Sequence, residues 1–150
     1  CLPKKEVYDM YKNELPEFEF KAHGASCPDE TYSDMKDIAR LMQESTFGWH
    51  IKPGGDGFGH VIHNWFAVGR PVIVSGWDYM GKLAGKLLED GVTCIDLDRH
   101  TFNENLRLIR YWAEPEHHKV MCENVYKKFK EVVNYDNEFL QIKEFLSNMI

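Results

Sequence analysis

Apolar residues recur along the chain with two spacings, one typical of amphipathic helices and one typical of short buried strands. The strand-like runs predict strands at Phe18–His23, Phe47–Lys52, Val72–Val74 and Val92–Leu97. Helical spacing predicts helices over Lys5–Asn13, Met35–Met42 behind a Ser33 cap, Phe58–Gly69, Tyr79–Leu88, and from Phe102 onward with breaks near Pro115 and Tyr135–Asp136.

Strands that alternate with helices predict parallel strands joined by crossover helices. The wholly apolar run Val72–Val74 is typical of a sheet that is covered on both faces. With right-handed crossovers, the fold expected for residues 1–150 is one α/β domain. It would be a Rossmann-like, doubly wound parallel sheet with helices on both faces and a helical C-terminal tail. Ligands of such sheets bind beyond the carboxyl ends of the strands.

Composition narrows the classes of function. The chain is 43% hydrophobic and 28% charged, as in soluble domains, and no apolar run is long enough to span a membrane. The net charge of -6 argues against nucleic-acid binding, which needs a basic surface. No secretory signal is evident, and the widely spaced Cys1, Cys27, Cys94 and Cys122 are expected to be free thiols in the cytoplasm. The start at Cys1 predicts a piece of a longer protein.

The segment after the Phe47–Lys52 strand carries the candidate chemistry. It reads Lys-Pro-Gly-Gly-Asp-Gly-Phe-Gly-His from Lys52 to His60 and leads directly into a predicted helix. Glycines let a ligand approach the main chain closely. The start of a helix offers unpaired amides and the positive end of its dipole. The segment therefore predicts a phosphate site, although many glycine-rich turns are only tight connections.

The stretch from Asp56 to Ile73 resembles the donor-site segment of retaining glycosyltransferases with the GT-B fold. The shared pattern is an acidic residue, Gly-Phe-Gly, four mostly apolar residues, a small-residue helix, Gly-x-Pro and a Val-Ile strand. The turn Glu89–Val92 is similar to a later acidic-Asp-Gly-Val turn of that family, and the C-terminal helices are also similar. The resemblance covers about residues 33 to 150.

The resemblance implies a role for each matching residue. Asp56 would be the catalytic carboxylate, hydrogen-bonded to hydroxyls of the donor sugar and close to the positive charge that develops at its anomeric carbon. Gly57 would also be a substrate-binding residue, and the amides of Phe58 and Gly59 would meet the sugar. Those of His60 and Val61 would meet the diphosphate.

Two departures from the family pattern bear on affinity. Asn64 stands where the family has a Glu that binds the ribose hydroxyls. Asn can still bind a diol, but without the charge-assisted bond, which is about twice as strong. No glycine-Arg and Lys-Gly pair for the diphosphate is evident near the N-terminus. Lys52, at a strand end beside the loop, is a possible substitute or an ordinary surface lysine.

Several residues have alternative interpretations. His50, His60 and His63 lie near Asp56 but have no recognised metal spacing, so no metal is expected. Trp49 and Trp77 could stack on a base or a sugar ring, although packing is the simpler expectation for both. Segment 75–78 could border the ligand. The apolar stripe of the predicted helix is expected to be core and comprises Phe58, Val61, Ile62, Trp65 and Phe66.

The function expected from the resemblance is retaining hexosyl transfer from a nucleoside-diphosphate sugar, with no separate cofactor. An N-terminal domain outside this sequence would hold the acceptor, so these 150 residues alone are expected to have little or no turnover. Two alternatives stay open: a degenerate module that binds a nucleotide without catalysis, and a nucleotide-sugar epimerase of the same fold.

Overall fold

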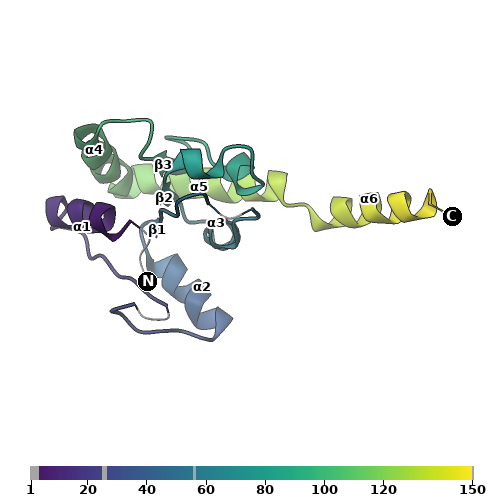
Figure 1. Cartoon of the computed structure of the whole chain (residues 1–150), viewed down its shortest axis with the longest axis horizontal. Coiled ribbons are helices and arrows are strands. Elements are labelled where there is room, and N and C mark those ends of the chain that lie inside the picture. The colour runs from purple at the N-terminus through teal and green to yellow at the C-terminus, as the bar shows by residue number, and fades with distance from the viewer. Residues whose placement is uncertain (1–3, 25–26, 56, 150) are drawn as a thin grey trace.

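The structure of the protein is a computed structural model that describes residues 4–24, 27–55 and 57–149. Helices and short strands alternate over the first two thirds of the chain, and helices alone follow (Figure 1). The elements are α1 (Lys5–Glu14), α2 (Met35–Glu44), β1 (Gly48–His50), α3 (His60–Ala67), β2 (Val72–Val74), the 3-10 turns η1 (Gly76–Tyr79) and η2 (Ala84–Leu87), β3 (Cys94–Asp96), α4 (Phe102–Ala113), α5 (Pro115–Val132) and α6 (Tyr135–Ser147).

The three strands of the described residues form one parallel sheet in the order β1-β2-β3. Trp49 pairs with Ile73, and Ile73 pairs with Ile95, so neighbouring strands stand in register. The chain returns from β1 to β2 through α3, and from β2 to β3 through η1 and η2. The expected α/β class with a parallel sheet is therefore confirmed.

Alternate residues of β2 point to opposite faces of the sheet and enter two different cores. Val72 and Val74 pack in one core with residues of α3, η2 and α5, including Phe66 and Val125. Ile73 packs in the other with residues of α1, β3, α4 and α5, which are Tyr11, Ile95, Leu106, Ile109 and Met121, and with Leu15. Both faces of the sheet are thus covered, and this explains why β2 is wholly apolar.

Local signals explain where the C-terminal helices begin. Thr101 caps α4: its hydroxyl accepts from the Glu104 amide, and the Glu104 carboxylate accepts from the Thr101 amide at 2.8 Å. The Thr101 hydroxyl also donates to this carboxylate and lowers the pKa of Glu104. Pro115 occupies the first turn of α5, where its missing N–H costs nothing.

Helix α6 differs from the other helices because every residue from Tyr135 to Ser147 is exposed. Figure 1 shows α6 continuing beyond the body of the molecule, after α5 has crossed it. It carries large apolar side chains, such as Phe139 at 66% exposure, but contributes to neither core.

Four sequence expectations need correction. Segment 18–23 is not a strand, although Phe18 and Phe20 pack against the core that contains Ile73. Asp34, not Ser33, caps α2, because its carboxylate accepts from the Lys36 amide. The helix expected over 79–88 is replaced by η1 and η2. Cys27 is disulfide-bonded rather than a free thiol, whereas Cys94 and Cys122 are free and Cys1 lies outside the described residues.

Candidate functional site

The carboxyl ends of the three strands meet at one edge of the sheet because the strands are parallel. Segment 51–55 leaves β1 at this edge, Ser75 and Gly76 follow β2, and segment 97–100 follows β3. In open parallel sheets this edge is where ligands bind. The glycine-rich segment therefore lies at the edge that the sequence predicted.

The glycine-rich segment is attached to the neighbouring η1–η2 region. The Gly54 amide donates to Asp78 Oδ1 at 2.8 Å, and the Lys82 ammonium group donates to the Gly54 carbonyl. These bonds link the turn after β1 to the turn after β2. The two turns consequently form one wall at the edge of the sheet.

Gly59 begins α3 in a conformation that needs glycine. Its φ of 77° lies in the left-handed region, and a Cβ there would stand 2.4 Å from Ala84 Cβ in η2. Its carbonyl accepts the first helical bond from the His63 amide at 3.1 Å. The amides that directly follow Gly59, beginning with that of His60, have no acceptor within the helix and lie at the positive end of its dipole.

Gly57 is the exception among the eleven glycines. Each of the other ten either has a positive φ or would bring a Cβ within 3.0 Å of another atom. Gly57 has no positive φ, is exposed, and a Cβ added to it would meet no described atom within 4 Å. Neither a positive φ nor a close contact with a described atom therefore requires a glycine at this position.

The predicted contact residues differ in exposure. Phe58 is 46% exposed and stacks on His63, with ring centroids 4.3 Å apart, so its expected place in the core is wrong. The catalytic candidate Asp56 lies outside the described residues. The others are exposed or half-buried: His60 and Asn64 are exposed, and Lys52 and Val61 are half-buried. Ile62 and Phe66 are buried, as expected.

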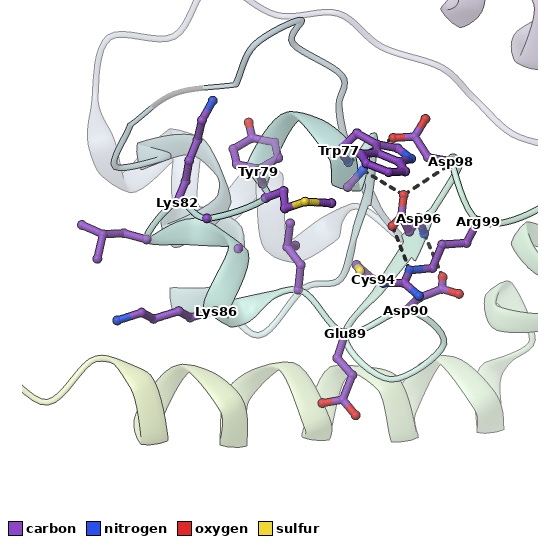
Figure 2. Close-up of a pocket in the computed structure, with 16 residues that line it drawn as sticks. Trp77, Tyr79, Lys82, Lys86, Glu89, Asp90, Cys94, Asp96, Asp98 and Arg99 are labelled. Atoms are coloured by element: carbon purple, nitrogen blue, oxygen red, sulfur yellow. Dashed lines mark hydrogen bonds and ion pairs between the residues drawn. The ribbon is translucent and has the colours of Figure 1, made fainter.

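Carboxylates at the end of β3 hold the turn after β2 (Figure 2). Asp96, 8% exposed, accepts from the Gly76 amide at 2.8 Å and from Arg99 Nε at 3.2 Å. Asp98 Oδ2 accepts from the Ser75 hydroxyl at 2.6 Å and from the Trp77 amide at 3.1 Å. The backbone of segment 75–77 is therefore fixed from the neighbouring strand.

A cavity of about 1080 Å³ lies between the η1–η2 region and the end of β3. Figure 2 shows Trp77 beside Asp96 and Asp98 in its lining, with Lys82 and Lys86 farther along it. Cys94 also lines it, but burial, helped by nearby carboxylates, raises the pKa of this thiol far above its usual value. Cys94 is thus a neutral wall residue rather than a nucleophile.

A smaller cavity of about 260 Å³ lies at the same edge of the sheet, between α1 and the start of α4. Two residues that sequence reasoning overlooked, Lys4 and Asn105, line it. Asn105 Nδ2 donates to the carbonyl of Leu97 at 3.0 Å, whereas its buried Oδ1 has no hydrogen-bond partner in the described part of the chain. The sequence signal for Asn105 was a polar amide side chain next to Leu106, within the helical stripe that faces the core.

Residues 57–61 do not appear in the described lining of these two cavities. Across residues 4–24, 27–55 and 57–149, no group of three His, Cys, Asp or Glu side chains is placed to hold a metal ion. Within the same ranges, no helix combines the length and apolarity needed to cross a membrane. The chain matches no family model, no curated protein and no solved structure.

Proposed function

We propose that this chain holds the nucleoside-diphosphate sugar of a retaining glycosyltransferase, with the diphosphate at the start of α3. Gly57 carries the proposal, because it is the one glycine that neither φ nor packing requires. A main chain without a Cβ lets phosphate oxygens approach its amides. The start of α3 adds amides and the positive end of a helix dipole, which favour an anion.

The wider architecture supports the same site. The proposed fold is part of a doubly wound, Rossmann-like sheet, and three parallel strands in sequential order with helices against both faces agree with it. The glycine-rich turn leaves the carboxyl end of β1, where ligands of such sheets bind. The net charge of -6 makes a local amide site the more reasonable way to hold an anion.

In the proposed complex the amides of Phe58 and Gly59 contact the sugar, and those of His60 and Val61 contact the diphosphate. Asp56 stabilises the positive charge that develops at the anomeric carbon as the bond to the diphosphate breaks. The amides stabilise the negative charge on the leaving group. Most of the catalytic effect then comes from positioning and from electrostatics that are in place before the reaction.

Lys52 and Asn64 take the outer positions of the proposed site. Lys52 would neutralise part of the diphosphate charge, and Asn64 would bind the ribose hydroxyls. Because Asn64 is exposed and lacks a charge, its bonds to a diol are weaker than those of a carboxylate. This observation favours, as a second candidate, a module that binds the nucleotide without turnover.

Calorimetric titration with UDP, GDP, ADP and their hexose conjugates tests the proposal. We expect one of these series to bind, and Gly57→Ala to weaken that binding by at least about tenfold, because the methyl group occupies space proposed for the bound donor. Gly91→Ala is the control for a glycine substitution elsewhere: Gly91 also has open space around it, but it lies outside both cavity linings and in a different turn. Because its φ of 71° strains an alanine, the stability of this variant is measured beside its affinity.

Two results would contradict the proposed function. One is that none of the nucleotides binds in the millimolar range. The other is that Gly57→Ala binds as tightly as the unaltered protein while Gly91→Ala also leaves affinity unchanged. If a nucleotide does bind, two assays distinguish the candidate functions. Hexosyl transfer to an acceptor indicates the transferase rather than the binding module, and sugar interconversion without an acceptor indicates the epimerase.

A further inference from the structure

Trp77 is exposed in a way that the other tryptophans are not. Its exposed fraction is 69%, whereas Trp49, Trp65 and Trp112 pack against the two cores. The expectation that Trp77 would be a packing residue is therefore wrong. Beside it, Met80 and Leu83 are 64% and 49% exposed and line the same cavity of about 1080 Å³. A large apolar surface gathered at a cavity indicates a binding site rather than scattered exposure.

The backbone that carries Trp77 is held rigidly. The Trp77 amide donates to Asp98 Oδ2, and the preceding amide, that of Gly76, donates to Asp96 Oδ1. A Cβ on Gly76 would stand 2.1 Å from Asp96 Oδ2, so the turn and β3 are in close contact. An aromatic side chain on a backbone that is already fixed loses little conformational entropy when a ligand covers it.

The charges of the cavity disfavour an anionic ligand. Its lining has four carboxylates (Glu89, Asp90, Asp96 and Asp98) against three cationic side chains (Lys82, Lys86 and Arg99). Two of the cations are engaged, because Lys82 donates to the Gly54 carbonyl and Arg99 to Asp96. Three of the carboxylates already accept from backbone amides: Asp90 from Asp96, Asp96 from Gly76, and Asp98 from Trp77. Each carboxylate has about four acceptor sites, so hydroxyl groups at the edge of a ligand can still donate to them.

We propose that this cavity binds a neutral carbohydrate, with one pyranose ring stacked on the indole of Trp77. The C–H face of a pyranose is apolar and matches the exposed apolar side chains of this lining, Trp77, Met80 and Leu83, while its hydroxyls reach the carboxylates. The ring belongs either to the acceptor or to the sugar of the donor. Only this choice between acceptor and donor rests on the proposed function. The hydrogen bond from Lys82 to the Gly54 carbonyl links the cavity wall to the turn that leads to the proposed diphosphate site.

Indole N–H resonances give a direct test, because the four tryptophans report separately in a two-dimensional NMR spectrum. The Trp77 resonance is assigned by its loss in Trp77→Phe. The probes are methyl glycosides of glucose, galactose, mannose and N-acetylglucosamine, a glucose oligosaccharide, and the nucleoside diphosphates with and without hexose. We expect a saturable shift of Trp77 while Trp49, which packs in the core, stays unchanged.

Variants provide the second readout. Trp77→Ala should weaken saccharide binding about tenfold, and Trp77→Phe should retain most of it, because the aromatic face supplies the contact. The melting temperatures of both should stay close to that of the unaltered protein, since Trp77 is mostly exposed. A loss of affinity in Trp77→Ala that accompanies a large fall in melting temperature would contradict this role.

The probes also distinguish the two sources of the sugar. A shift with free saccharides places the acceptor in the cavity, and a shift with nucleotide sugars but not with the bare diphosphates places the donor sugar there. No Trp77 shift with any saccharide or nucleotide sugar at tens of millimolar would overturn the proposal. A shift as large with the bare diphosphates would also overturn it, because the ring on Trp77 would then be a base. If no nucleotide binds, the proposed function fails, and the shifts with free saccharides alone decide whether the cavity binds a carbohydrate.

Discussion

The turns after β1 and after β2 lie side by side at the sheet edge, and each combines glycines that packing requires with one residue that packing does not explain. In the first turn Gly55 and Gly59 are required and Gly57 is not, and in the second Gly76 is required and the exposed Trp77 is unexplained. The required glycines allow close contact with η1, η2 and β3. The unexplained residues face open space. A glycine-rich turn thus contains positions where a Cβ would clash and positions where it would not, and only the first kind is explained by packing.

Among Gly57, Gly59 and Gly76, the largest effect on stability is expected at Gly59. Gly59→Ala must adopt a φ of 77° and places its methyl carbon 2.4 Å from Ala84 Cβ, so strain and overpacking add. We expect a loss of about 2–4 kcal/mol in the free energy of unfolding. Urea denaturation followed by circular dichroism measures it. A loss below 0.5 kcal/mol, on the order of an exposed substitution, would remove the distinction between Gly59 and Gly57.

A smaller loss is expected at Gly76. Gly76→Ala pushes the Asp96 carboxylate away and leaves the Gly76 amide without its acceptor, which costs about 1–3 kcal/mol. The control is the same substitution in an Asp96→Ala background, where the clash is gone. If the contact with Asp96 is the cause, the two losses are not additive. Additive losses would show that Gly76 is constrained by something else.

The smallest effect, and one of opposite sign, is expected at Gly57. Gly57→Ala fits the native backbone and meets no described atom, and alanine restricts the unfolded chain. The free energy of unfolding should therefore rise by about 0.4–1 kcal/mol. Urea denaturation beside Gly59→Ala provides the comparison. A clear loss of stability would give Gly57 a structural role and weaken the case for a ligand.

The cysteines Cys94 and Cys122 also differ in burial, and their reactivity should differ accordingly. Burial raises the pKa of both free thiols, and Cys94 is the more deeply buried. Neither thiol has the lowered pKa of a reactive cysteine, and Cys94 should be modified only through unfolding. Alkylation at pH 8 followed by mass spectrometry should modify Cys122 first. Rapid native modification of Cys94 would indicate that the cavity wall opens.

Much of the fold could be predicted because local patterns coincide with long-range ones. Val72–Val74 has the predicted bounds, since an apolar run between Pro71 and Ser75 matches a strand buried on both faces. Segment 18–23 instead alternates apolar and polar residues, which is also a strand pattern, and yet it is not a strand. Phe18 and Phe20 bury their side chains, but no ladder pairs their backbone among the described residues. Alternation reports which side chains are buried, not whether a neighbouring strand is available.

The candidate site could be predicted only in part. The glycine-rich segment, the start of a helix at His60 and the strand before it are local features, and the structure has them. The clamp on segment 75–77 depends on Asp96 and Asp98, about twenty residues later, so no local pattern could indicate it. The exposure of Trp77 follows from that clamp, and the sequence favoured packing.

The sequence by itself determined the alternation of helices and strands, the sites where α4 and α5 begin, and the glycines that make the turn after β1 possible. These features depend on hydrophobic spacing, capping and backbone freedom, all of which act within a few residues. Only the tertiary structure decided which glycines are required, which tryptophan stays exposed and which carboxylates face one cavity. Those outcomes depend on contacts between segments distant in the chain, where packing and desolvation, rather than local preference, determine the arrangement.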